Sequence, residues 1–134
     1  MTLRSGTTTL ITSALLFSGC TSDSSSSNSV QVPLTQAASG GDYRLRTTAT
    51  ISNEEFDDGQ RAQIHVQAMP STSNPPNNRT PLLNGVIEMR DGAPSISCAM
   101  PRTYVWSDFA AWNDLDLTCV SEVDLSNAQS VIIS

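Results

Sequence analysis

The sequence predicts an all-β fold over residues 43–134, a small antiparallel β-sandwich or barrel of six to seven short strands. Apolar and polar residues alternate with a period of two along several segments, which is the pattern of a strand with one buried face. Clusters of Asp, Asn, Gly and Pro separate these segments and are typical of turns. No segment has the apolar spacing of a long helix, so we expect one domain of strands joined by turns.

The expected strands follow one another along this domain. Residues 43–51 alternate, and residues 62–68 are the clearest example because every second residue is apolar. Further expected strands are 83–89, 96–100, 102–106, 115–123 and the closing 131–133, with turns at 57–59, 74–78, 91–92 and 113–114. One helical turn is expected over residues 107–112, with Ser107 or Asp108 as its cap.

The first twenty residues have the organisation of an export signal. A polar segment with a single charge, Arg4, precedes an apolar run from Leu10 to Phe17 that is too short to cross a bilayer. The motif Phe17-Ser18-Gly19-Cys20 follows at once. It resembles the lipobox of bacterial lipoproteins, although that family usually has Leu, Val or Ile where Phe17 stands. The resemblance implies a signal peptide over residues 1–19 and a lipid on Cys20.

Ordinary secretion without a lipid is the alternative. The general signal peptidase requires small residues one and three positions before the cut. A cut before Cys20 would place Phe17 three positions before it, and a cut before Gly19 would place Leu16 there. The lipoprotein interpretation fits better, and it implies export and membrane anchoring. Thr21 rather than Asp after the cysteine implies, by the same resemblance, the outer membrane if the cell is Gram-negative.

Residues 20–42 are expected to form a Ser-rich flexible tether between the lipid and the domain. Few of these residues are apolar, so they bury too little surface to offset the entropy of ordering. Val30, Val32 and Leu34 alternate as in an edge strand, but Pro33 argues against a central strand. A tether is therefore favoured.

The three cysteines support the same interpretation, because an odd number in an exported protein requires an explanation. If Cys20 carries the lipid, Cys98 and Cys119 remain as one pair in an oxidising compartment. Both lie on the apolar phase of their expected strands. We therefore expect one intrachain disulfide between neighbouring or facing strands.

Charge excludes one class of function. Seven arginines and no lysine stand against thirteen acidic residues, so the net charge is −6. A nucleic-acid-binding protein needs a basic face that displaces counterions from phosphates, and this chain has none. The expected partners are instead the membrane, through the lipid, and an envelope protein or glycan.

The sequence contains no recognisable catalytic constellation, and we expect no cofactor. His65 is the only histidine and lies on the polar phase of its strand; as a general base it would need a nucleophile and a carboxylate supplied by the fold. One His and two bridged cysteines do not form a four-ligand zinc site. Glu55, Asp57 and Asp58 are the best calcium ligands, but the EF-hand spacing fails and a solvated acidic turn is favoured.

Four of the seven aromatic residues lie within nine positions, namely Tyr104, Trp106, Phe109 and Trp112. Such a cluster can stack on sugar rings or anchor a protein partner, and it is the binding surface that the sequence offers. The alternative, which is favoured, is that these rings fill or close the core of a small β domain. The two interpretations differ in whether the rings are exposed.

The sequence therefore favours a non-enzymatic envelope lipoprotein whose tethered β domain is a binding or accessory module. An inhibitor of an attacking hydrolase such as lysozyme is one alternative, since an acidic chain complements a basic enzyme. A small carboxylate-dependent hydrolase is the other. Its acidic residues would have to lie about 5–10 Å apart across a cleft, for which so small a domain offers little room.

Overall fold

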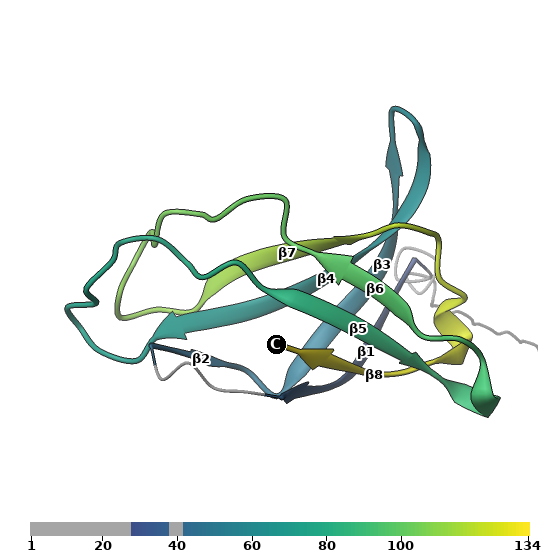
Figure 1. Ribbon diagram of the computed structural model, residues 1–134, viewed down its shortest axis with the longest axis horizontal. Coiled ribbons are helices and arrows are strands. Elements are labelled where there is room, and N and C mark those ends of the chain that lie inside the picture. The colour runs from purple at the N-terminus through teal and green to yellow at the C-terminus, as the bar shows by residue number, and fades with distance from the viewer. Residues whose placement is uncertain (1–27, 38–41) are drawn as a thin grey trace, which may run out of the picture.

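The computed structural model describes residues 28–37 and 42–134, and alternating apolar and polar residues make most of this part of the chain form strands (Figure 1). In chain order the strands are β1 Ser29–Gln36, β2 Tyr43–Leu45, β3 Thr48–Phe56, β4 Gly59–Pro70, β5 Asn84–Met89, β6 Ile96–Ala99, β7 Asn113–Cys119 and β8 Ala128–Ile133. Two short 3₁₀ segments, η2 Arg90–Gly92 and η3 Leu125–Asn127, follow β5 and precede β8. In these described residues no helix has the length and apolar character that a membrane span requires.

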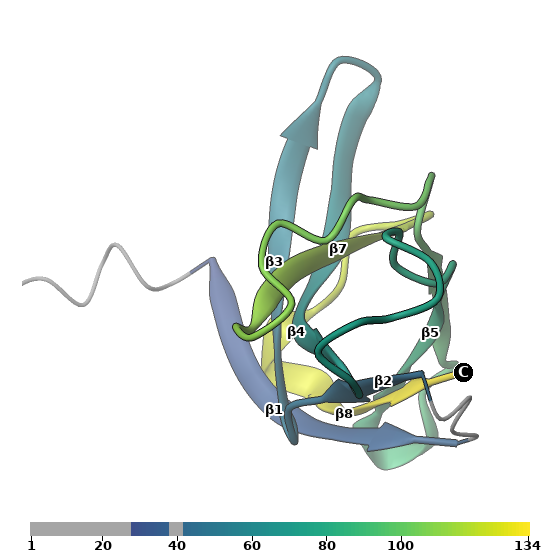
Figure 2. The same cartoon turned by 90° about the vertical axis from the view of Figure 1, so that its left-hand side faces the viewer.

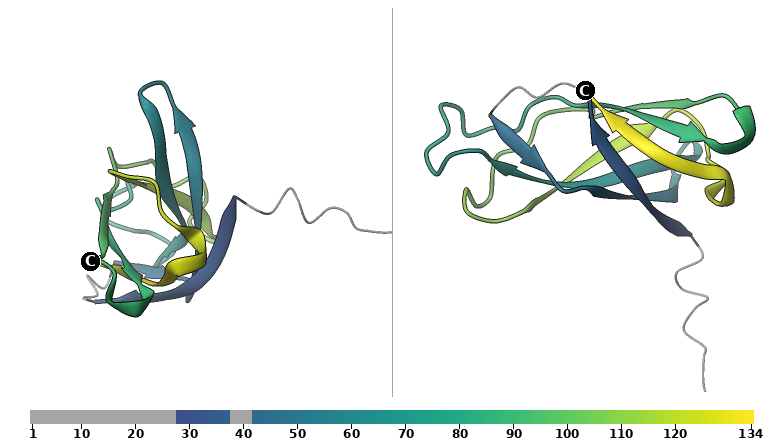
Figure 3. Two further views of the ribbon diagram at one scale, coloured as in Figure 1. Left: turned by 90° about the vertical axis from the view of Figure 1, so that its right-hand side faces the viewer. Right: turned by 90° about the horizontal axis from the view of Figure 1, so that it is seen from below.

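Seven of the strands close into a barrel, which Figure 2 shows from one end. Hydrogen-bonded neighbours run in the order β4, β3, β1, β8, β5, β6 and β7, and β7 pairs back onto β4. β2 pairs with the last residues of β4. Every pairing is antiparallel except that of β1 with β8, which is parallel (Figure 3). The all-β fold predicted from the sequence is therefore confirmed, in its barrel form.

The apolar phases of the strands fill the barrel interior. In β4 every second residue from Ala62 to Ala68 is buried, as the alternation predicts. Gly85 of β5 also faces this core, and a Cβ there would lie 3.0 Å from Ile64 Cδ1 and 3.1 Å from Leu117 Cδ2. Even a methyl group would force the neighbouring side chains to move. The largest fully buried side chains include Ile51, Ile64, Leu83, Ile87, Leu115, Leu117 and Ile133.

β1 lies where the sequence predicts part of the tether. Its first five residues pair with β3 and its last three with β8, so residues 29–36 are a central strand of the barrel. Pro33 is tolerated because it is the last residue paired with β3, and the next N–H, that of Leu34, donates to Thr47 O at 2.7 Å. The expected signal peptide, Cys20 and the Ser-rich start of the tether lie outside the described residues.

Tyr43, the first residue of β2, also belongs to this buried region. Its side chain is 7% exposed and hydrogen-bonds with Gln36 at the end of β1. Burial raises the pKa of Tyr43, and the hydrogen bond with Gln36 lowers it in part. This contact gives β1 a side-chain connection to the domain in addition to its backbone pairing.

β2 and β3 form one interrupted strand along β4, where the sequence predicts a continuous strand over residues 43–51. Leu45 pairs with Ala68 and Thr50 pairs with His65, so four residues between these pairs face two on β4. The two extra residues form a bulge, which bends a strand and changes the direction of its side chains. Because their number is even, β3 continues with the same residues facing the core. Arg46 lies in this bulge and is exposed.

Two short elements expected from the sequence differ in the structure. Residues 102–106 form no strand and contribute only an isolated bridge between Arg79 and Val105. Residues 107–112 form bends and a turn rather than a helical turn. Asn113, expected in a turn, is instead the buried first residue of β7.

Cys98 of β6 and Cys119 of β7 form the expected disulfide. The two residues are directly opposite each other, their Cα atoms are 4.0 Å apart, and both side chains are buried. The bridge joins neighbouring strands and encloses the long connection between them.

Reduction of this disulfide should destabilise the barrel. For residues 21 positions apart, the chain-entropy model assigns the bridge about 3 kcal/mol of stability, by restricting the unfolded chain. We expect the free energy of unfolding, measured with urea, to fall by about that amount in reductant. A Cys98→Ala/Cys119→Ala variant should have the same free energy of unfolding as the reduced protein, and reductant should not change it. Coincident wild-type curves with and without reductant would show that the bridge does not stabilise the fold.

Candidate functional site

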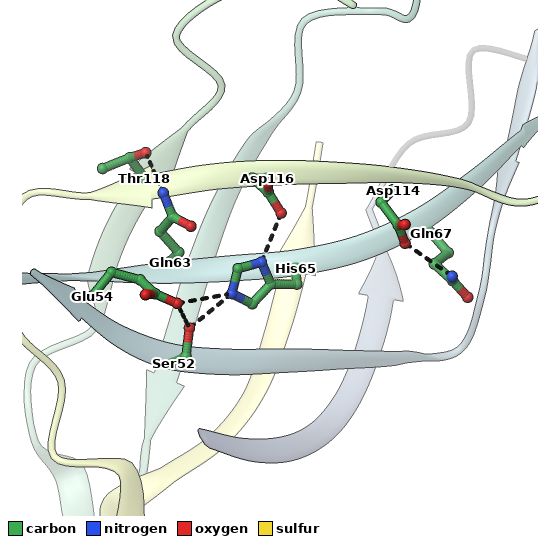
Figure 4. Close-up of polar contacts among 8 residues, drawn as sticks. All are labelled: Ser52, Glu54, Gln63, His65, Gln67, Asp114, Asp116 and Thr118. Carbon is green, nitrogen blue, oxygen red and sulfur yellow. Dashed lines mark hydrogen bonds and ion pairs between the residues drawn. The ribbon is translucent and has the colours of Figure 1, made fainter. Parts of the chain in front are cut away.

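The outer face of β3, β4 and β7 carries a continuous array of polar side chains (Figure 4). The alternation that sends apolar residues into the core leaves polar residues on this face. The strand register then determines which of them meet. His65 of β4 lies between Thr50 of β3 and Asp116 of β7, and Gln67 lies opposite Asp114.

His65 is the centre of the array. Its Nδ1 lies 2.6 Å from Asp116 Oδ1, and its Nε2 lies 2.7 Å from Ser52 Oγ. Ser52 Oγ also donates to Glu54 Oε1 at 2.7 Å, and this carboxylate oxygen is 3.6 Å from His65 Nε2 (Figure 4). The fold therefore brings to the single histidine both the hydroxyl and the carboxylate that a catalytic base would need.

The contacts from Ser52 to His65 and from His65 to Asp116 join the same residue types as a hydrolytic triad. The surroundings of Ser52, however, do not suit nucleophilic catalysis. Ser52 has one hydroxyl proton, and both Glu54 Oε1 and His65 Nε2 lie 2.7 Å from its oxygen. The residue is only 7% exposed. β3 pairs with β1 on one side and β4 on the other, and the N–H that follows Ser52, that of Asn53, donates to Asn28 O at 3.2 Å. That N–H is therefore not free to stabilise an oxyanion.

The four groups satisfy one another as a cross-strand network. Ser52 donates to Glu54, and the two ring nitrogens of His65 lie within hydrogen-bond distance of Ser52 on one side and Asp116 on the other. Gln67 Nε2 donates to Asp114 Oδ1 at 2.9 Å on the same face. These bonds connect β3, β4 and β7 and fix the positions of the polar side chains.

A depression of about 330 Å³ lies beside His65 on this face. It is lined mostly by polar residues, namely Gln31, Arg46, Thr48, Thr50, His65, Gln67 and Asp114, together with Val66. A second depression, of about 450 Å³, shares Arg46 and Thr48 with the first and extends to Trp112. The two depressions together form a hollow surface with hydrogen-bonding groups at one end and an aromatic ring at the other.

Arg46 and Trp112 form a stacked pair where the two depressions meet. The guanidinium carbon of Arg46 lies 4.6 Å from the centroid of the Trp112 ring, within the range of a cation–π contact. The bulge between β2 and β3 supplies Arg46, and the loop before β7 supplies Trp112. Trp112 stays half-buried in this pair, so part of its ring is accessible.

A buried asparagine organises the loop that carries Trp112. Asn113 Oδ1 accepts hydrogen bonds from the N and Oγ of Ser107, at 3.1 and 2.6 Å, and from the N of Asp108 at 3.3 Å. Its Nδ2 donates to the carbonyl oxygens of Asp108 and Ala111, at 2.9 and 2.8 Å. These bonds replace those of the expected helical turn. Sequence reasoning missed this role because Asn before Asp is also a common turn pattern.

The structure separates the four clustered aromatic residues. Trp106 is 6% exposed and belongs to the core, and Tyr104 packs against that core. Phe109 is 36% exposed and Trp112 is half-buried. The four rings therefore do not share one exposed surface, and of these rings only that of Trp112 lines the depressions described above.

The acidic residues considered for calcium lie on the β3–β4 hairpin, which projects beyond the barrel (Figure 1). Gly59 adopts a φ of +125° and allows the tight turn after Asp57 and Asp58. Asp58 forms an ion pair with Arg61, and Glu55 is exposed. No group of three His, Cys, Asp or Glu side chains suited to a metal ion occurs in the described part of the chain.

Comparison with known protein families, with curated proteins and with solved structures finds no match to this chain. A barrel fold by itself does not define a function. Function is therefore inferred from the polar face, its stacked pair and the N-terminal motif.

Ser52 should not react as a nucleophile. We expect no covalent labelling of the folded protein by a fluorophosphonate probe, because the hydroxyl is buried and donates its proton to Glu54. A Ser52→Ala variant is the matched control, and it should give the same background signal as the wild type. Stoichiometric labelling of the wild type that the variant loses would instead identify the network as a catalytic triad.

Proposed function

We propose that this chain is an exported lipoprotein, anchored through Cys20, whose barrel is a non-enzymatic module that binds a neutral glycan of the cell envelope. One observation carries the binding function: polar side chains held by cross-strand hydrogen bonds line a depression that leads to the stacked pair of Arg46 and Trp112. Binding sites typically combine a few well-positioned polar groups with aromatic surface.

A glycan matches the chemistry of this surface. Sugar hydroxyls both donate and accept hydrogen bonds, and the depression offers amides from Gln31 and Gln67, a hydroxyl from Thr50 and a carboxylate from Asp114. The ring of Trp112 supplies an apolar surface for the faces of sugar rings. A strongly anionic ligand fits less well, because carboxylates outnumber arginines across this face.

Export and anchoring are supported by the sequence and by the disulfide. The motif ending at Cys20 resembles a lipobox, and it accounts for the third cysteine once the other two are paired. A buried structural disulfide is typical of proteins that fold outside the cytosol. Both observations favour an extracytoplasmic module over an intracellular one.

Lipidation should depend on a single cysteine. Metabolic labelling with radioactive palmitate should mark the wild-type protein in a bacterial host, and a Cys20→Ala variant should take up no label. A Cys98→Ala/Cys119→Ala variant serves as the control, because it retains Cys20 and should still be labelled. A mature chain that begins at any residue other than Cys20, as measured by mass spectrometry, would contradict the anchor.

Glycan binding should depend on Trp112. We expect Trp112→Ala to weaken binding of soluble β-1,4-linked N-acetylglucosamine oligomers by about tenfold, equal to about 1.4 kcal/mol, in isothermal titration calorimetry. Phe109→Ala, in the same loop but outside the depressions, is the matched control and should bind like the wild type. Equal affinity of the Trp112→Ala variant and the wild type would place the glycan elsewhere, and absence of wild-type binding would reject this glycan class.

Inhibition of an attacking hydrolase is the second candidate, and the projecting hairpin favours it. Glu55, Asp57 and Asp58 are exposed on the β3–β4 hairpin, Asp58 paired with Arg61, and the hairpin projects far enough to contact a basic enzyme such as lysozyme. The two functions use different surfaces. Neutralising the three acidic residues to amides would abolish hydrolase inhibition while leaving glycan binding intact, whereas Trp112→Ala would do the reverse.

A further inference from the structure

A third and smaller pocket, of about 130 Å³, lies at the end of the barrel formed by the β4–β5 and β6–β7 connections. These two connections extend past the strands on the same side of the molecule (Figures 1 and 2). They are joined by backbone bonds from Thr80 N to Tyr104 O, at 2.7 Å, and from Trp106 N to Asn78 O, at 2.9 Å. The walls of the pocket are therefore held by hydrogen bonds and not only by loop packing.

Trp106 forms part of the wall of this pocket. The residue is 94% buried, since 6% of its surface is exposed, and no other described residue hydrogen-bonds to its indole N–H. A buried indole N–H normally has a partner, because leaving it without one costs the desolvation of a donor. A ligand whose acceptor atom reaches this N–H would supply that partner.

The lining of the pocket includes one positive and one negative residue, Arg79 and Asp42, and both are exposed. Neither takes part in an ion pair among the described residues, either with the other or with a third group. Arg79 has one long side-chain contact, 3.5 Å to Thr103 Oγ1, so most of its five N–H donors are available. A purely anionic ligand would be repelled by Asp42 and a purely cationic one by Arg79.

Apolar surface lies between these charges. Pro75, Pro76 and Pro81 line the pocket together with the Trp106 ring, and their rigid rings leave its shape largely preformed. A ligand that satisfies every feature carries a carboxylate, an ammonium group and a small apolar portion. A free amino acid has these three groups within a few bonds of one another.

We propose that this pocket binds a small zwitterion of the amino-acid class, with Arg79 holding the carboxylate, Asp42 the ammonium group, and Trp106 and the three prolines enclosing the side chain. The site is separate from the polar face of β3, β4 and β7, because the residues that line the two share no member. This site is therefore independent of the proposed glycan-binding site, and a negative result for one ligand would not contradict binding of the other.

The test uses Trp106 fluorescence in a Trp112→Phe variant, where Trp106 is the only tryptophan. L-leucine should give a saturable change at concentrations up to about 10 mM. Leucinamide, which lacks the carboxylate, and N-acetyl-leucine, which lacks the ammonium group, should each bind about tenfold more weakly. Absence of a saturable response to leucine, or equal responses to all three compounds, would overturn the proposal.

Substitutions that remove one charge test which residue binds the carboxylate and which binds the ammonium group of the ligand. Arg79→Gln should remove the preference for leucine over leucinamide, and Asp42→Asn should remove the preference for leucine over N-acetyl-leucine. Arg90→Gln, at the far end of β5, is the matched control and should leave all three affinities unchanged. Arg79 and Asp42 are exposed, so these variants should retain the wild-type melting temperature. Retention of both preferences in both variants would also overturn the proposal.

Discussion

Closure of the sheet is the constraint on which the remaining structure depends. The order of the strands divides the barrel into two parts, with β4, β3 and β1 from the first part of the chain and β8, β5, β6 and β7 from the second. Two pairings join these two parts, β1 with β8 and β4 with β7. Loss of either would expose two strand edges with unpaired backbone groups and open the core to water. β1 is therefore as necessary to the domain as any strand after it.

The sequence predicts most of this barrel because alternation records which face of a strand is buried. It predicts β4 well, since Ile64 and Val66 lie on a clear apolar phase and are buried, whereas it predicts only the last three residues of β8 as a strand. It does not predict β1, because Pro33 is acceptable only at the position where the strand changes partner. That position is a property of the closed sheet and not of the segment itself.

The polar face illustrates a second limit of sequence reasoning. His65 meets Ser52 and Asp116, which are 13 and 51 positions away in the chain. The outward phase of each residue can be read from the alternation, but their meeting depends on the register of three strands. A slip of one residue would turn a whole strand over and disperse the network. This register joins residues far apart in the sequence, which local patterns do not encode.

The departures from regular structure gather around the Arg46–Trp112 pair. The bulge between β2 and β3 lies on one side of it, and the loop organised by Asn113 lies on the other. Both lower the stability of the fold, because a bulge interrupts the ladder of strand hydrogen bonds and a buried amide must have its hydrogen bonds satisfied.

Trp112 itself remains half-buried, although full burial in the core would stabilise the fold more. Such local conflicts are typical of functional positions, where a side chain is held for a ligand rather than for the fold. This is the physical reason for proposing that a ligand binds against this pair and in the depression that leads to it.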